Sequence, residues 1–306
     1  MKKILSLILC FAMTMSSMTV PVMAFAEEVS DTPVQEAAAV SAVPISAKPD
    51  MTMPSVSFHD TANHLGTKAI DRWAGFGVIK GDERGNFNPD GDLNRAELAT
   101  ILTNLLGLTA KAANSYADVP ANAWYADAVL KCTAAGIMKG DGINATPLAN
   151  ISRQESMVMI GRALGITPAA TVDLAAFTDG SAVAPWAAPY VTTMLKAGIV
   201  NGVGENLVAP NANMSRAAVV TVLDKAISDY IKVAGTYDKL VGTGLVVVAA
   251  PGVVLKDGQV QNLLVAQGAA DGSLTLENTN VIGNTMVLDN ATVILKNSKL
   301  QTLEVL

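Results

Sequence analysis

Apolar residues recur at helical spacing in three separate stretches of the chain. Leu98, Ile101, Leu102 and Leu105 stand at i, i+3, i+4 and i+7, which places them on one face of a helix. A matching pattern recurs in two later stretches, at Met157, Ile160 and Leu164 and at Val219, Val222, Leu223 and Ala226. A shorter apolar pattern precedes each stretch, at Ala69, Ile70 and Trp73, at Ala128, Val129 and Cys132, and at Val191, Met194 and Leu195. The pattern therefore predicts three helix–loop–helix units.

Three short motifs recur in the same order in these units. An aromatic-x-Asp triplet comes first, at 58–60, 116–118 and 177–179. A Gly-apolar-apolar-polar-Gly pentapeptide follows at 77–81, 136–140 and 198–202, and a polar-Arg pair follows at 94–95, 152–153 and 215–216. One repeat cannot bury its apolar face alone, so we expect the three copies to pack into one all-α domain.

From about residue 235 the pattern changes to short β-rich runs separated by Asn, Gly and Asp. The runs are 245–248, 253–255, 263–265, 274–276, 286–288, 293–295 and 303–305. Residues 261–265 align with 283–287, and 276–279 align with 295–298, at offsets of 22 and 19. These offsets favour parallel β-helix rungs, in which Asn278 and Asn297 would stack inside the coil. A small β-sandwich is the alternative.

The predicted fold class is therefore α+β and multidomain. Lys2 and Lys3, an apolar stretch and the Ala24-Phe25-Ala26 sequence are typical of a signal peptide at 1–26. A Pro-, Ala- and Ser-containing segment at 27–57 is predicted to be a disordered linker. The repeats are then expected at 58–112, 113–172 and 173–234, and the β-rich segment at 235–306.

The net charge, the apolar segments and the cysteine content make nucleic-acid binding, membrane insertion and an internal disulfide unexpected. Cleavage after Ala26 would remove two lysines and no acidic residue, which changes the net charge from −6 to −8. An acidic chain is a poor nucleic-acid binder, and no later segment is apolar for long enough to insert in a membrane. Only Cys132 remains after cleavage, so no internal disulfide is possible. We expect it to pack as a small apolar residue, with a reactive thiol as the alternative.

A cap-type residue precedes an arginine at the start of each second helix. The pairs are Asn94–Arg95, Ser152–Arg153 and Ser215–Arg216. Glu155 completes a capping box with Ser152, and Glu97 comes close to one with Asn94. Unpaired N–H groups of a helix N-terminus, beside a guanidinium fork, would suit a carboxylate ligand. The alternative is that the arginines are solvated or pair with Asp60, Asp118 and Asp179.

The order of these motifs resembles the S-layer homology (SLH) family over about residues 58–230. The resemblance implies an exported protein at the bacterial cell surface, attached to a secondary cell-wall polysaccharide that carries pyruvate ketals. It also implies that grooves between the repeats bind the glycan through Asp60, Asp118, Asp179, Trp124, Trp186, Gly81, Gly140, Gly202, Arg95, Arg153 and Arg216. In this interpretation Arg and helix N–H groups bind the carboxylate, Asp binds sugar hydroxyls, Trp covers the ring and Gly allows close approach.

Some of these positions depart from the family pattern or allow a second interpretation. Leu65 stands where Trp is expected, Asn201 replaces the Lys found at 80 and 139, and Ala218 replaces the signature Glu. At least one groove is therefore expected to be weakened. The second repeat is the most complete, which favours Asp118, Trp124 and Arg153. The two tryptophans could equally be core wedges between repeats.

Catalysis is not expected. The β-rich segment contains scattered acids and no His, Cys or Arg, and no nucleophile–base pair or phosphate loop is evident elsewhere. The oxygen-rich loop at 81–92 lacks EF-hand spacing, and His59 and His64 lack a third zinc ligand, so no cofactor or metal is predicted. The last predicted rung begins at the chain end without a polar cap, which suggests a fragment or self-association. A wall-attached polysaccharide enzyme and a lattice protein remain as alternative functions.

Overall fold

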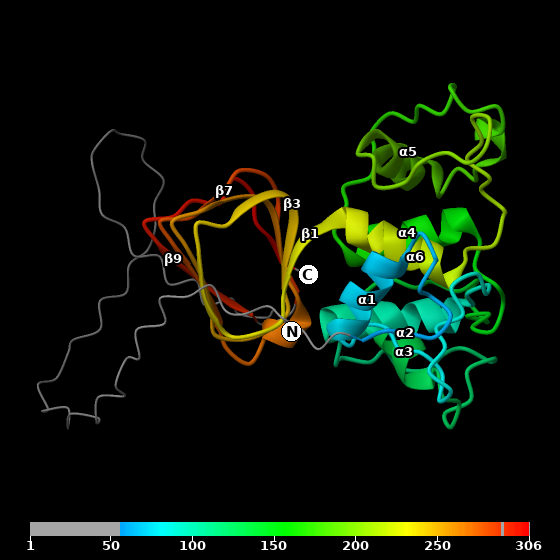
Figure 1. Ribbon diagram of the computed structural model, residues 1–306, viewed down its shortest axis with the longest axis horizontal. Helices are drawn as coiled ribbons and strands as arrows, with labels where there is room; N and C mark the ends of the chain where they lie inside the picture. The colour runs from blue at the N-terminus through cyan, green and yellow to red at the C-terminus, as the bar shows by residue number, and fades with distance from the viewer. Residues whose placement is uncertain (1–55, 289–290, 306) are drawn as a thin grey trace, which may run out of the picture.

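The computed structural model describes residues 56–288 and 291–305, which form a helical part and a β-solenoid side by side (Figure 1). The predicted signal peptide and linker residues 27–55 lie outside the described residues. All-α repeats followed by parallel β-helix rungs are the fold class that the sequence predicts, and this prediction is confirmed. No helix in the described ranges combines the length and apolar character that a membrane span requires.

Each predicted helix–loop–helix unit forms. The helices are α1 (Thr67–Gly75), α2 (Arg95–Leu106), α3 (Ala126–Ala134), α4 (Arg153–Ala163), α5 (Ala188–Lys196) and α6 (Arg216–Ala226). The first helix of one repeat packs on the second helix of the repeat before it, because α3 contacts α2 and α5 contacts α4. Helix α1 contacts α6, so the third repeat closes on the first. The repeats therefore form a ring.

The first glycine of each pentapeptide ends the first helix. Gly77, Gly136 and Gly198 have φ of 69°, 68° and 68°, a conformation that side chains with a Cβ rarely adopt. In the second repeat the N–H of Gly136 donates to the carbonyl of Thr133, and that of Ile137 donates to Cys132. These bonds satisfy carbonyls that a helix end leaves unpaired. The chain then turns towards the loop that bears the second glycine.

Three short backbone segments meet at the centre of the ring. The N–H of Leu93 donates to Met214, that of Ile151 to Leu93, and that of Met214 to Ile151, at 2.9, 2.9 and 3.0 Å. This cyclic set joins one residue from each repeat. Because the three side chains are buried, the same segments seal the core.

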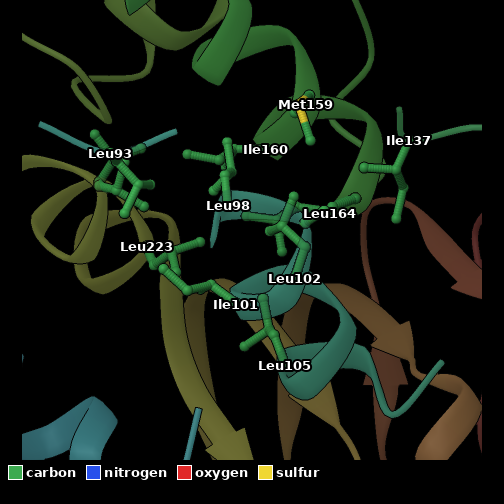
Figure 2. Close-up of a cluster of buried hydrophobic side chains, with 14 of the residues drawn as sticks. Leu93, Leu98, Ile101, Leu102, Leu105, Ile137, Met159, Ile160, Leu164 and Leu223 are labelled. Carbon is green, nitrogen blue, oxygen red and sulfur yellow. The ribbon is translucent and has the colours of Figure 1, made fainter. Parts of the chain in front are cut away.

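The core lies between the helices, where Leu98, Leu102, Ile160 and Leu223 converge (Figure 2). Each fully buried side chain of this kind contributes about 1.5–3 kcal/mol. Cys132 belongs to the same core, and its thiol donates to the carbonyl of Ala99. Burial raises the pKa of Cys132 to about 11. The apolar interpretation of this residue is therefore confirmed over the reactive one.

The β-rich segment is a parallel solenoid. Its strands are β1 (Ile227–Ile231), β2 (Gly235–Asp238), β3 (Val241–Val248), β4 (Val253–Lys256), β5 (Gln259–Val265), β6 (Ser273–Glu277), β7 (Asn280–Val281), β8 (Thr285–Val287), β9 (Thr292–Lys296) and β10 (Glu304–Val305). One sheet has the order β1-β3-β5-β8-β10 and the other β2-β4-β6-β9. Leu263 pairs with Thr285 and Leu276 with Leu295, which are the predicted offsets of 22 and 19. The β-sandwich alternative is wrong, since these ladders are parallel.

A polar ladder runs along one corner of the solenoid. The amide of Asn297 donates to Asn278, and that of Asn278 donates to Asp257, both at 2.8 Å. All three residues have φ near 50°, at 51°, 48° and 51°. Stacking of the two asparagines is confirmed, but their predicted place inside the coil is wrong. They lie exposed at the corner, where both residues adopt the left-handed backbone conformation that Asn tolerates.

The two parts share one core at their junction. Helix α6 passes directly into β1 at Ile227, inside the range predicted for the third repeat. The solenoid begins earlier than predicted because Ile227–Ile231 pairs with β3. No turn signal in the sequence marks the start of this strand. Tyr230 is buried against Trp73 and Phe76, and its hydroxyl donates to the carbonyl of Leu105 at 2.8 Å. The solenoid is thereby fixed on the helical ring.

Candidate functional site

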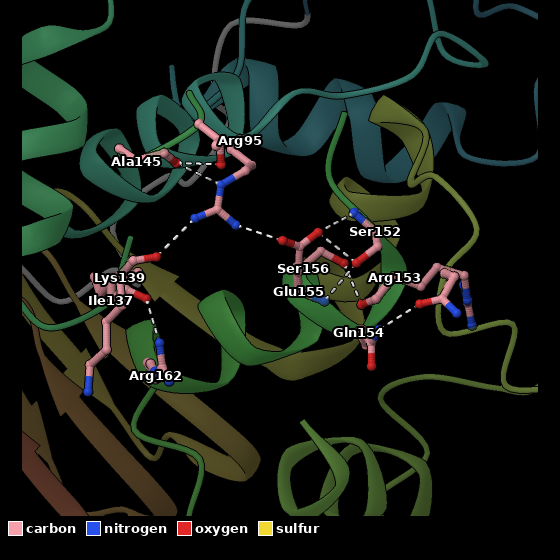
Figure 3. Close-up of polar contacts among 12 residues, drawn as sticks. Arg95, Ile137, Lys139, Ala145, Ser152, Arg153, Gln154, Glu155, Ser156 and Arg162 are labelled. Carbon is pink, nitrogen blue, oxygen red and sulfur yellow. Dashed lines mark hydrogen bonds and ion pairs between the residues drawn. The ribbon is translucent and has the colours of Figure 1, made fainter. Parts of the chain in front are cut away.

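Arg95 lies at the start of α2 and reaches into the second repeat (Figure 3). Its Nε donates to the carbonyl of Ala145 and its Nη2 to that of Lys139, both at 3.0 Å. Its Nη1 pairs with the Glu155 carboxylate at 2.9 Å. The guanidinium is nearly buried and uses three edges at once. It therefore joins the first repeat to the loop and second helix of the next.

The other two arginines repeat this geometry around the ring. Arg153 donates to Val208 at 3.0 Å and to Asn201 at 3.2 Å, and Arg216 donates to Phe87 at 2.8 Å and to Lys80 at 2.9 Å. Burial lowers the pKa of both arginines below its ordinary value, yet guanidinium groups stay charged in proteins. Each arginine thus contacts the loop of the following repeat, and the third returns to the first.

The acid partners of the arginines differ. Glu155 pairs with Arg95, and Glu97 lies 3.9 Å from Nη1 of Arg216. The equivalent position for Arg153 is Ala218, which has no carboxylate. Nη1 of Arg153 contacts the Met214 sulfur at 3.7 Å. The substitution at 218 therefore leaves that edge of the Arg153 guanidinium without an ion-pair partner among the described residues, and the charge of Asp179 acts on Arg153 without a direct pair.

The predicted aspartates bind backbone rather than one another. Asp60 accepts N–H bonds from Phe87 and Asn88, Asp118 from Ala145 and Thr146, and Asp179 from Val208 and Ala209, all at 2.7–2.8 Å. Each carboxylate thus fixes the loop of its own repeat, next to the carbonyl that an arginine contacts. The arginines do not pair with these aspartates directly. The two residue types stabilise the same loop, the aspartate through backbone N–H groups and the arginine through a backbone carbonyl.

The Asp60 carboxylate makes the stability of the protein depend on pH. Partial desolvation raises the pKa of Asp60, but the N–H groups of Phe87 and Asn88 outweigh it and leave the pKa below its ordinary value. A depressed folded pKa stabilises the protein above the unfolded value of about 3.9, and this contribution is lost as the pH falls through the folded value. We expect the unfolding free energy of Asp60→Asn to fall less steeply below about pH 4. Urea titrations from neutral to acidic pH would measure this.

The matched control is Asp238→Asn, an exposed position on the solenoid. It should keep the acid slope of the wild type. Equal slopes for Asp60→Asn and the wild type would contradict the assigned role of Asp60.

The helix N-terminal N–H groups are already bonded within the protein. In α2 the N–H of Arg95 donates to Ala149 and that of Ala96 to Pro147, while that of Glu97 donates to the Asn94 side chain. The same bonds recur at α4 and α6 with carbonyls of the third and first repeats. The prediction that these N–H groups are unpaired is wrong, because a loop of the next repeat lies across each helix start.

The second glycine of each pentapeptide allows packing inside its own repeat. A Cβ on Gly140 would overlap the Asn144 carbonyl and the Tyr116 ring, and one on Gly81 would overlap the Phe58 ring. Gly202 has the same relation to Phe177. The aromatic residue of each aromatic-x-Asp triplet therefore packs directly on this glycine. Gly140 also lines a surface groove.

Gly140→Ala should destabilise the protein by about 2–3 kcal/mol, because the new methyl overlaps backbone that cannot move freely. Gly136→Ala is the matched control in the same repeat. No atom lies within 4 Å of its added Cβ, so only its positive φ is penalised, by about 1 kcal/mol. Denaturant unfolding measures both values. Equal losses would show that the packing on Gly140 is unimportant.

Trp124 and Trp186 lie on the surface, with 63% and 52% of their area exposed. The core-wedge interpretation of the two tryptophans is therefore wrong. The wedge position belongs to Trp73, which is fully buried. An exposed indole offers a flat apolar face of the kind that packs against a ligand ring.

Trp186 lies in a groove of about 400 Å³ that all three repeats form. Arg95 comes from the first repeat, Lys139 and Gly140 from the second and Trp186 from the third. Arg162 on α4 completes its cationic side, and donates to the Ile137 carbonyl (Figure 3). We call this the Arg95 groove. Sequence reasoning missed Arg162, a half-buried residue whose signal is its position nine residues after Arg153 on α4.

A second groove of about 330 Å³ contains Arg153. Leu65, Asn201 and Ala218 all line it, so the three departures from the repeat pattern fall in one place. Lys225 on α6 stands where Arg162 stands in the Arg95 groove. We call this the Arg153 groove.

The repeat relation assigns Trp124 to the surface around Arg216 and Lys80. Each site takes its arginine from one repeat, its glycine turn from the next and its tryptophan position from the third. Asp118, Trp124 and Arg153, the favoured set from the second repeat, are therefore distributed over different sites. Sequence alone could not reveal this, because it shows the repeats and not their order around the ring.

A comparison of the sequence with known families identifies the three repeats. The profile of the family described as S-layer homology domain matches residues 57–99, 115–155 and 176–220. The helical part consists of three S-layer homology domains. The SLH chain is 34% identical over 53% of its length to the surface-layer 125 kDa protein of Lysinibacillus sphaericus. It is 28% identical over 55% to an amylopullulanase of Thermoanaerobacterium thermosulfurigenes, and 34% identical over 30% to the S-layer protein sap of Bacillus anthracis.

The chain spans 14%, 9% and 11% of the lengths of these relatives. The SLH domains and the surface-layer relatives together support a secreted cell-surface protein that is anchored to the cell wall. The export and surface location expected from the sequence agree with this.

Proposed function

We propose that the SLH ring anchors the protein by binding a pyruvylated secondary cell-wall polysaccharide in its inter-repeat grooves. The observation that carries the proposal is the Arg95 groove, where an exposed tryptophan and the cations Lys139 and Arg162 line one hollow, together with the Arg95–Glu155 pair and Asp141. A sugar with a ketal carboxylate has both complementary features, an apolar ring face and an anionic group.

The contacts in the Arg95 groove suggest separate roles for its residues. Arg95 is already paired with Glu155 and two carbonyls. It therefore positions the loop and contributes positive charge to the groove, rather than offering free guanidinium N–H groups to a ligand. The exposed Lys139 ammonium and Arg162 are the cations better placed to reach a ligand carboxylate. Trp186 would cover the sugar ring.

The Arg153 groove has a different balance. It lacks the tryptophan and the turn lysine, but among the described residues no carboxylate forms an ion pair with the edge of Arg153 beside Ala218. A ligand carboxylate could pair with that edge without displacing a glutamate. Charge-assisted pairs of this kind are about twice as strong as neutral hydrogen bonds.

Binding rather than catalysis is the proposed activity of this chain. The relatives that share its SLH region include surface-layer proteins and an amylopullulanase, so this region is compatible with either kind of remaining protein. The solenoid is proposed to be structural, and lattice assembly through protein contacts is the second candidate. The parallel ladders of the solenoid favour that candidate, as do two exposed apolar residues, Leu303 just before β10 and Val305 within it.

Tryptophan fluorescence tests the glycan proposal directly. The chain has three tryptophans, of which Trp124 and Trp186 are exposed and Trp73 is buried as an internal reference. Added wall polysaccharide should shift the emission to shorter wavelength and protect the exposed indoles from acrylamide. In Trp124→Leu the protection should report Trp186 alone. Unchanged acrylamide quenching at saturating polysaccharide would contradict the proposal. Protection of the indoles that rises with protein concentration, and not with added polysaccharide, would favour lattice assembly.

A further inference from the structure

A groove of about 560 Å³ lies where the helical ring meets the solenoid. The ends of α4, α5 and α6 form one wall, and strands β3, β5 and β8 form the other. Its volume is within the range of about 300–1,000 Å³ that is usual for small-ligand sites. We call it the junction groove.

The junction groove is contiguous with the Arg153 groove. Ile199 and Lys225 line both. The Lys225 side chain is exposed and so can face ligands on either side. A chain-like ligand bound at Arg153 therefore meets the solenoid as its next surface.

The lining has the chemistry of a neutral, hydroxyl-rich ligand. Thr243, Asn262 and Asn284 supply hydroxyl and amide groups from successive turns of the solenoid, and Leu245 and Met286 supply apolar contact. Among the residues that line the groove there is no carboxylate, and Lys225 is its one charged side chain. Amides and hydroxyls both donate and accept hydrogen bonds, as sugar hydroxyls require.

The groove is preformed by a rigid junction. The Met286 side chain packs so closely on Gly165 that a Cβ there would overlap it, and Asn284 donates to Thr167 at 3.3 Å. The continuous passage of α6 into β1 fixes the two walls further. Preformed walls lower the ordering cost of binding.

We propose that the solenoid extends the glycan site: a polysaccharide whose acidic end lies in the Arg153 groove continues into the junction groove, where Thr243 and Asn262 bind neutral sugar units. The inference rests on the proposed glycan binding. It gives the Arg153 groove, which lacks the tryptophan, a second source of affinity.

Length dependence of binding tests this inference. Calorimetry of the chain after the predicted signal peptide would compare a short glycoside that carries a pyruvate ketal with longer fragments of the same wall polysaccharide that keep this terminal unit. Longer fragments should bind at least about tenfold more tightly. Equal affinity for both ligands would overturn the inference while leaving the proposed function intact, and absence of binding by both would overturn the two together.

Thr243→Trp provides the matched variant, because Thr243 is exposed and its replacement would fill the junction groove. It should remove the gain with length and leave the short ligand unaffected. Thr292→Trp, on the exposed face of β9 in the opposite sheet, should behave as the wild type. A length gain that survives Thr243→Trp would also overturn the inference. If Thr243→Trp does not fold, the wild-type comparison still decides.

Discussion

Trp186→Ala should weaken binding to the purified wall polysaccharide by about 30-fold. Half of the indole is exposed in the Arg95 groove, so its removal takes away the apolar face opposite the cations. Loss of a central aromatic contact costs about 2 kcal/mol, which corresponds to that factor. Because Trp186 contributes little to the core, the thermal unfolding temperature should stay the same. Calorimetry and a thermal melt measure the two quantities.

Val233→Ala is the control for Trp186→Ala. Val233 is an exposed apolar residue between β1 and β2, outside the grooves. It should leave both affinity and stability unchanged. Wild-type affinity in Trp186→Ala, or an equal loss of affinity in both variants, would contradict binding of the polysaccharide in the Arg95 groove.

Arg95→Ala should destabilise the protein by about 3 kcal/mol. The substitution leaves the carbonyls of Lys139 and Ala145 without their donor and the Glu155 carboxylate without its partner. Removing one member of a largely buried pair is costly because the remaining charge stays desolvated, although partial exposure of Glu155 reduces the penalty. Chemical denaturation measures the loss.

Arg153→Ala is the natural comparison, because its guanidinium contacts two carbonyls and no carboxylate. It should cost about 1–2 kcal/mol. In addition, Arg95→Ala/Glu155→Gln should recover part of the loss, since Gln keeps the capping geometry without the charge. Equal losses in Arg95→Ala and Arg153→Ala would show that the ion pair contributes nothing.

Much of the fold could be predicted because its local signals agree. Helical spacing, cap residues and the glycine at each helix end all indicate the same boundaries around Arg95 and Gly136. In the solenoid the offset of 22 between Leu263 and Thr285 is the strand register itself. Strand β1 escaped prediction because its pairing with β3 is non-local and no turn separates it from α6.

The site was harder to predict than the fold. The residue types were found, since Arg95, Gly140 and Trp186 do meet in one groove. Their grouping was not, because each groove combines three repeats and the sequence does not show which repeats are neighbours. The roles of the aspartates and glycines were also assigned to ligand contact, whereas Asp118 and Gly140 have contacts that stabilise their own loop. The family resemblance therefore identified the residues of the grooves, but not the contacts that they make.

Sedimentation of the mature chain with purified cell-wall sacculi, before and after mild acid removal of the pyruvate ketals, measures whether the SLH ring binds the ketal carboxylate. The sugar content of the treated sacculi would confirm that the polysaccharide itself remains. We expect the protein to bind untreated sacculi and to be released from treated ones, because the grooves are proposed to bind the ketal carboxylate. Equal binding to both preparations would contradict carboxylate recognition by the SLH ring.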